Sequence, residues 1–80
     1  MKVTVRFFAS LKEEMGLERE ELKLDEGSTI TDLLEALKKA HPVLRDNDKF
    51  LIAVNGIRSD HNQRLGEGDI VALLPPVSGG

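Results

Sequence analysis

The residues with the clearest chemical potential stand at the end of the chain, which reads Leu74-Pro-Pro-Val-Ser-Gly-Gly80. Two prolines favour an extended backbone at the start of this segment, and the last three residues have almost no side-chain volume. Residues 75–80 span about 20 Å when extended, so the terminal carboxylate can enter a narrow channel in another protein. An ATP-dependent partner can convert a carboxylate into an acyl-adenylate. A sulfur donor then gives a thiocarboxylate, whereas a lysine amine gives an isopeptide bond.

Other groups of polar residues predict turns and caps rather than catalysis. Ser59-Asp60-His61 contains the residue types of a hydrolase triad, but side chains of sequence neighbours diverge, which favours a polar turn. His41 precedes Pro42 at an expected helix end, where a cation interacts favourably with the helix dipole. Asp46-Asn47-Asp48 lacks the glycine and the glutamate of a calcium loop. We therefore expect this chain to bind no metal and no cofactor. Any active-site residues are expected in a partner.

Composition excludes several classes of protein. The 80 residues include 11 Lys and Arg against 14 Asp and Glu, a net charge of −3, and no cysteine. The cations are scattered, so we expect no nucleic-acid binding, which requires a concentrated basic face. No run approaches the roughly 20 apolar residues of a membrane span. Arg6 interrupts the only apolar stretch near the N-terminus, so no signal peptide is expected and a cytoplasmic location follows by default.

The elements that must position the chain end follow from periodicity and capping. Apolar alternation and turn signals predict strands over 2–8, 21–24, 50–54, 57–58 and 70–74, with loops over 43–49 and 59–69. Capping boxes predict a short helix that Ser10 caps and that runs to about Met15, and a long helix that begins after Thr29 and ends before Pro42. Asn55-Gly56 is a strong hairpin signal. The result is an α+β fold, in which a four- to five-stranded sheet carries one main helix on one face.

One helix can cover only one face of such a sheet. Phe8 remains apolar on the opposite face of the first strand, and the strand over 70–74 is apolar on both faces. An exposed apolar patch is therefore expected, and such patches commonly mark protein interfaces.

These features together resemble the ubiquitin-like β-grasp sulfur carriers, and more specifically the MoaD family of molybdopterin synthase small subunits. The resemblance extends over essentially the whole chain. Its motifs are Val5-Arg6-Phe7-Phe8-Ala9, Thr29 through Leu37, Ala53-Val54-Asn55-Gly56, and Leu65 through Gly80 with its Pro-Pro-Val-Ser-Gly-Gly ending. It implies a β-grasp domain with a mixed sheet over residues 1–74, followed by a flexible tail over residues 75–80.

The resemblance also implies a function. Gly80 would be adenylated by a ubiquitin-activating-like enzyme that uses ATP, and a sulfur donor would convert its carboxylate to a thiocarboxylate. Gly79, which has no side chain, would leave the reacting carbonyl of Gly80 accessible. The tail would then enter the large subunit of molybdopterin synthase and donate sulfur to a cyclic pyranopterin phosphate. This chain would be the non-catalytic, sulfur-carrying subunit of a heterotetrameric sulfurtransferase.

The docking residues that the resemblance implies are Phe8, Ile57, Arg58, Leu74, Pro75, Pro76, Val77 and Ser78. Many relatives carry an aromatic residue where this chain has Leu74. The net negative charge and the anionic tail predict a basic pocket in the partner. Three other functions stay open: a modifier joined to lysines through Gly80, a thiamine-type sulfur carrier, and an interaction domain whose tail is idle.

Overall fold

The computed structural model describes residues 1–46 and 50–75. In chain order, the elements are β1 (Lys2–Phe7), α1 (Ala9–Met15), β2 (Arg19–Lys23), α2 (Ile30–Ala40), the 3-10 helix η1 (Pro42–Asp46), β3 (Leu51–Val54), β4 (Ile57–Arg58) and β5 (Ile70–Leu74). All five predicted strands and both predicted helices are present, with small shifts of their ends. None of the described helices has the length and apolar character needed to cross a membrane.

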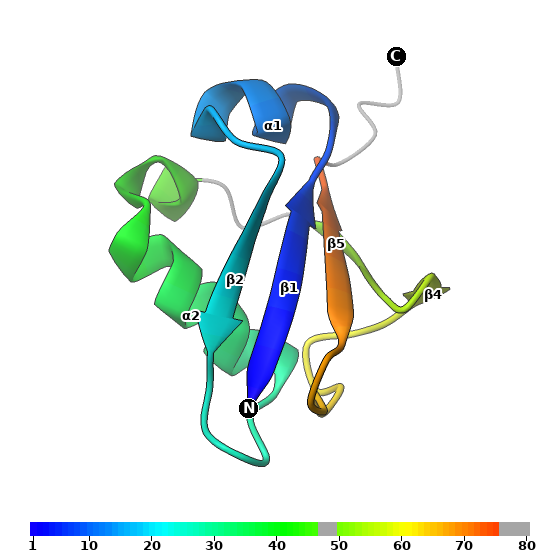
Figure 1. Cartoon of the computed structure of the whole chain (residues 1–80). Helices are drawn as coiled ribbons and strands as arrows, with labels where there is room; N and C mark the ends of the chain where they lie inside the picture. The colour runs from blue at the N-terminus through cyan, green and yellow to red at the C-terminus, as the bar shows by residue number, and fades with distance from the viewer. Residues whose placement is uncertain (47–49, 76–80) are drawn as a thin grey trace.

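The five strands form one mixed sheet in the order β2-β1-β5-β3-β4 (Figure 1). The first and last strands, β1 and β5, pair in parallel, with Val5 opposite Val71. The other neighbouring strands pair antiparallel. In the view of Figure 1, α2 lies behind the sheet. The predicted α+β architecture, with one main helix on one face, is confirmed.

The core lies between α2 and the sheet. Alternate side chains of β1 point to this side, and Val3, Val5 and Phe7 are at most 2% exposed. The apolar stripe predicted for the long helix faces them. Its members, all buried, are Ile30, Leu33, Leu34 and Leu37. Because each element contributes one apolar side, the sheet and α2 together bury a single core.

Local side-chain chemistry sets the start of α2. The main-chain N–H of Asp32 donates to Thr29 Oγ1 at 3.4 Å, and Asp32 Oδ2 accepts from the main-chain N–H of Thr29 at 2.9 Å. These reciprocal bonds confirm the predicted capping box and satisfy amides that have no partner within the helix. The helix ends at Ala40, because Pro42 cannot donate the hydrogen bond needed to extend it.

The start of α1 differs from the prediction that Ser10 caps the helix. The helix begins at Ala9, and Phe8 occupies the N-cap position without a side-chain cap. The N–H of Leu11 donates to the carbonyl of Phe8 at 3.1 Å, so the first turn follows directly from β1. The N–H of Phe8 in turn donates to the carbonyl of Leu73 at 3.2 Å. Pairing with β5 therefore fixes this helix start, and the local Ser10 pattern does not decide it.

Other boundaries also differ from the prediction, and two of them are informative. The second strand is Arg19–Lys23 rather than 21–24, because its pairing with β1 begins before the apolar alternation becomes visible. Residues 43–49 are not all loop, since η1 extends from Pro42 to Asp46. This 3-10 helix places Leu44 in the core with 1% exposure, which explains why the chain does not leave α2 as an open loop.

Tight turns join the strands at the base of the sheet. Asn55 and Gly56 both have positive φ angles, 51° and 84°, as the predicted two-residue hairpin turn requires. The Asn55 side chain also donates to Asp69 Oδ1 and accepts from the N–H of Ile70, both at 3.0 Å. The N–H of Gly66 donates to Asp69 Oδ2 at 2.7 Å, which confirms the predicted turn before β5.

Candidate functional site

The sheet face that points away from α2 is here called the outer face. Its strand residues are Lys2, Thr4 and Arg6 on β1; Arg19, Glu21 and Lys23 on β2; Leu51 and Ala53 on β3; Arg58 on β4; and Ile70, Ala72 and Leu74 on β5. The outer residues of β5 are apolar but accessible, with Ile70 47% exposed and Ala72 and Leu74 partly exposed. The predicted apolar patch opposite the helix is confirmed.

An apolar row crosses the outer face where β5 ends. Leu51 and Leu74 are cross-strand partners. Because the N–H of Phe8 donates to the carbonyl of Leu73, the parallel ladder continues and places Phe8 beside Leu74. All three apolar side chains are partly exposed, and the chain leaves this row through the partly buried Pro75. The C-terminal segment therefore starts at the edge of an apolar surface.

Arg6 contacts the aromatic member of that row. Its guanidinium carbon lies 5.3 Å from the centre of the Phe8 ring, within the range of a cation–π interaction. Both side chains point to the outer face because they are two positions apart in an extended segment. Phe8 was singled out from the sequence, whereas this role of Arg6 was missed. The alternation of β1 already put both residues on one face.

The hairpin end presents its two residues on opposite faces. Arg58 pairs with Ala53 and belongs to the outer face. Ile57 pairs with Val54 and belongs to the side of α2, yet it is 71% exposed because β4 is an edge strand. Among the docking residues suggested by the sequence, the outer face thus brings together Phe8, Leu74 and Arg58, while Ile57 stands at the sheet edge.

The remaining members of the suggested site belong to the chain end. Pro76, Val77, Ser78, Gly79 and Gly80 lie outside the described residues. Their roles in docking and sulfur transfer therefore stay predictions. What the structure does give is the place where the segment begins, at Pro75 beside the apolar row.

The triad-like residues form turn hydrogen bonds, as expected. Ser59 Oγ donates to a main-chain carbonyl two residues earlier at 3.0 Å, and Asp60 Oδ1 accepts from the N–H of Asn62 at 2.9 Å. The main-chain carbonyl of His61 accepts from Thr31 at the start of α2. No serine–histidine hydrogen bond is found within these contacts, so the loop attaches to the helix start instead of forming a catalytic relay.

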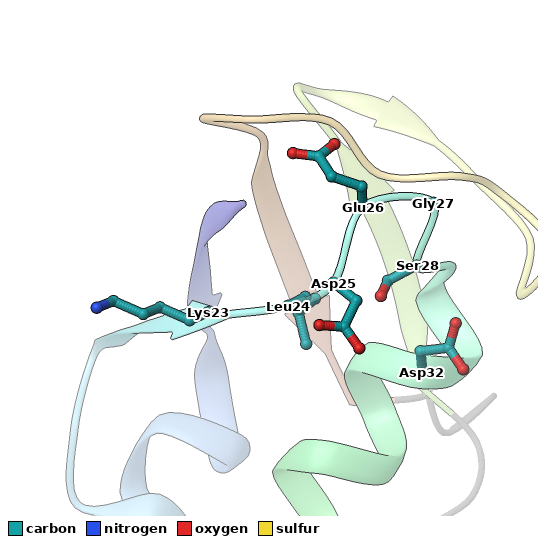
Figure 2. A pocket seen from close by; sticks show the side chains of 7 residues that line it. All are labelled: Lys23, Leu24, Asp25, Glu26, Gly27, Ser28 and Asp32. Atoms are coloured by element: carbon teal, nitrogen blue, oxygen red, sulfur yellow. The ribbon is translucent and has the colours of Figure 1, made fainter.

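A shallow acidic pocket lies beside the start of α2 (Figure 2). Its lining residues are Lys23, Leu24, Asp25, Glu26, Gly27, Ser28 and Asp32. Figure 2 shows the Lys23 side chain extending away from the other labelled side chains, and Asp32 is engaged in the capping box. Within residues 1–46 and 50–75, no group of three or more histidine and acidic side chains is arranged to hold a metal ion.

The exposed Glu18 carboxylate lies near cations of α1, β1 and β2. Its carboxylate accepts a salt bridge from Lys12 Nζ at 3.0 Å. This hydrogen bond and the Lys12 charge lower the pKa of Glu18, and the charges of Arg6 and Arg19 lower it further. Several cations therefore surround one exposed carboxylate, although the chain as a whole is acidic.

A five-stranded mixed sheet packed against one long helix is the architecture of the ubiquitin-like β-grasp proteins. The chain belongs to the ThiS family, whose model matches residues 5–80. One curated relative is the molybdopterin synthase sulfur carrier subunit of Chlamydomonas reinhardtii, 34% identical, with all of both chains covered. Another is small archaeal modifier protein 1 of Haloferax volcanii, 37% identical over 94% of this chain and 97% of the relative.

Solved structures show the same fold. The putative molybdopterin converting factor subunit 1 of Pyrococcus furiosus superposes with a TM-score of 0.89 and 34% identity, covering 96% of this chain and 99% of that one. A chain of the complex of subunits 1 and 2 of the molybdopterin-converting factor of Helicobacter pylori superposes with a TM-score of 0.72 and 34% identity, with full coverage of both. The predicted β-grasp fold and family are confirmed.

Proposed function

We propose that this chain is a sulfur carrier for molybdopterin synthesis and that Gly80 is its reactive residue. The proposal is supported by relatives named as molybdopterin synthase sulfur carrier subunits over the full chain length. The structural observation that carries it is the apolar row of Phe8, Leu74 and Leu51, which lies where the C-terminal segment begins. A partner held on this row would meet the C-terminal segment where that segment begins, at Pro75.

The chemistry requires little from the folded domain. The Gly80 carboxylate attacks the α-phosphate of ATP on an adenylating enzyme, and pyrophosphate leaves. Hydrosulfide from the sulfur donor then attacks the acyl-adenylate carbonyl, AMP leaves, and loss of a proton gives the thiocarboxylate. In the large synthase subunit this sulfur passes to a cyclic pyranopterin phosphate. The domain contributes recognition and reach, so the residues that catalyse each step belong to the partners.

Docking through the sheet face offsets the cost of ordering the chain end. Fixing each backbone residue costs about 1–2 kcal/mol, and small side chains return few contacts. An interface of standard size, roughly 800 Å² on each partner, can supply the compensating apolar burial. The complex of subunits 1 and 2 in Helicobacter pylori supports an assembly of this kind. We propose the large synthase subunit as the partner, in a heterotetramer.

A second function is favoured by one specific observation. Small archaeal modifier protein 1 of Haloferax volcanii is 37% identical to this chain. In that case the same acyl-adenylate is attacked by a lysine amine, and Gly80 becomes part of an isopeptide bond. Both functions use the same activated chain end, so they differ only in the nucleophile.

Intact mass spectrometry separates these functions. The full chain is incubated with its adenylating enzyme, ATP and a sulfide donor. Sulfur transfer increases the mass by the difference between one sulfur and one oxygen atom, and the change maps to the C-terminal peptide. Protein modification instead gives larger conjugates on a denaturing gel. A chain that shows neither product contradicts both proposals and supports an interaction domain.

A further inference from the structure

Two arginines stand directly opposite each other on neighbouring strands. Arg6 of β1 and Arg19 of β2 are cross-strand partners. The N–H of Phe7 donates to the carbonyl of Glu18 at 2.8 Å, so the alternation of an antiparallel ladder makes Arg6 and Arg19 a non-hydrogen-bonded pair. Side chains approach most closely in such pairs, and like charges placed there are destabilising. The isolated domain therefore carries this pair at a cost to its own stability.

The pair lies in a basic area of an acidic chain. The outer residues of β1 and β2 are Lys2, Thr4, Arg6, Arg19, Glu21 and Lys23. Four cations and one carboxylate give this strip a charge of +3, whereas the whole chain has a net charge of −3. Glu18 is close enough to interact with both arginines, but it also pairs with Lys12 at 3.0 Å, so adding this ion pair leaves the charge of the area at +3.

The surface beside the pair is hollow enough to admit another side chain. Thr4, Arg6, Glu18, Arg19 and Ile70 line a shallow pocket on the outer face. Both arginines are exposed, and Ile70 is 47% exposed. The pocket thus combines two arginines, the Lys12-paired Glu18 and an accessible apolar wall.

Small residues occupy the next positions of this cross-strand row. Ala72 is the partner of Arg6 on β5, and Ala53 is the partner of Ala72 on β3. Arg58 then closes the row on β4. A docking protein can therefore approach the backbone of the central strands closely while arginines stand on either side.

We propose that the Arg6–Arg19 pair binds acidic side chains of the protein that docks on the outer face. This inference rests on the proposed function and specifies the charge of the partner surface. A guanidinium group binds a carboxylate through two parallel hydrogen bonds, and a carboxylate between two such groups removes their mutual repulsion. The unfavourable pair in the free domain thus becomes a favourable contact in the complex.

The position of the pair is continuous with the apolar row. Arg6 lies 5.3 Å from the ring of Phe8, so an acidic group at the pair and an apolar group at the row belong to one contiguous surface. The acidic partner surface proposed here and the basic pocket predicted for the anionic chain end are different regions of the same partner. Charge complementarity at both regions sets the orientation of docking.

The test uses Arg19→Gln in the full-length chain, because Arg6 also holds the Phe8 ring. Arg45→Gln is the matched control, since Arg45 is an exposed arginine on η1 and its replacement changes the net charge equally. Affinity for the large synthase subunit is measured by calorimetry at low and high salt, and the melting temperature by circular dichroism. We expect Arg19→Gln to weaken binding about tenfold at low salt and to flatten the salt dependence.

The melting temperature distinguishes a binding role of Arg19 from a structural one, because loss of a structural residue would lower it. Arg19→Gln is expected to keep or raise it, because the like-charge pair is relieved, while Arg45→Gln leaves affinity unchanged. Equal affinities of the wild type and Arg19→Gln overturn this inference and leave the proposed function intact. If the wild type binds ATP or inorganic phosphate, or associates with itself, and Arg19→Gln does not, the pair serves another ligand. That outcome also overturns this inference. A wild type that fails to bind the large subunit overturns the proposed function itself.

Discussion

His41 Nε2 lies 2.6 Å from Glu20 Oε1, and this contact joins the C-terminal end of α2 to the edge strand β2. His41 is the C-cap of the helix, and its N–H donates to the carbonyl of Leu37 at 2.8 Å. Both side chains are largely buried, with exposures of 23% and 29%. The helix-end position predicted for His41 is confirmed, and the histidine has a structural partner rather than a catalytic one.

Removal of this contact is expected to destabilise the fold without changing its chemistry. Glu20→Ala leaves the His41 ring without its partner and should lower the free energy of unfolding by about 1 kcal/mol. Urea denaturation of Glu20→Ala, His41→Ala and the double variant measures the coupling between them. Additive effects of the two substitutions would show that the short contact contributes no pairwise stabilisation.

The capping box of α2 gives a second prediction. Thr29→Ala removes the oxygen that accepts from Asp32, so it should lower the free energy of unfolding by about 1 kcal/mol. Thr29→Ser keeps the acceptor and serves as the control. The check is the denaturation midpoint of the two variants. Equal losses in both would mean that the methyl group, not the hydroxyl group, stabilises this helix start.

Two glycines differ in what an added methyl group would do. Gly56 has a φ of 84°, so Gly56→Ala forces an unfavourable left-handed conformation and should cost about 1–2 kcal/mol. Gly66 has no positive φ, and a Cβ there would lie 3.8 Å from the Asp69 carboxylate, an ordinary contact. Gly66→Ala should therefore be nearly neutral. Thermal unfolding of both variants tests this difference, and similar losses would contradict it.

The lowered pKa of Glu18 predicts how one carboxylate contributes to stability at low pH. Lys12 lowers its pKa in the folded state, so the contribution of the carboxylate to stability is complete above the unfolded pKa and is lost as the pH falls through the folded pKa. Lys12→Gln should raise the pKa of Glu18, as followed by NMR of its side-chain carboxyl carbon. Lys23→Gln is the control and should leave that titration unchanged. An unaltered Glu18 titration in Lys12→Gln would exclude Lys12 as the cause.

The chain end is expected to be dispensable for folding and essential for sulfur transfer. Deletion of Gly80 removes the carboxylate at the required position, so thiocarboxylate formation should be abolished. The melting temperature should stay within about 2 °C of the wild type, because the described core is formed by residues before Pro75. Mass spectrometry and thermal unfolding of the same sample make the comparison. A large loss of stability would contradict the separation of the folded domain from its reactive end.

Sequence reasoning succeeded where all interacting atoms lie within a few residues. The Thr29–Asp32 capping box and the Asn55-Gly56 turn depend on local backbone geometry, so their patterns were sufficient. The Ser10 capping box failed for an instructive reason. Strand pairing fixed Phe8 before the helix, and this long-range constraint overrode the local signal.

The charged part of the site needed the register of the strands. Arg6 and Arg19 become partners only when β1 pairs with β2 in one specific alignment. The contact between Glu20 and His41 likewise joins residues that are 21 positions apart. The apolar outer side of β5 was predictable, because alternation alone separates the two sides of a strand. The cations of β1 and β2 could not be assigned to the same surface without the strand register.

The place of β5 in the sheet couples folding to protein synthesis. This strand lies between β1 and β3, so neither can complete its pairing until β5 has left the ribosome. Residues 70–74 follow every other strand of the sheet in chain order, yet they lie in the middle of the finished sheet. A nascent chain that stops earlier lacks the central strand and cannot close its core. Synthesis of the chain through β5 is thus required before the domain can fold.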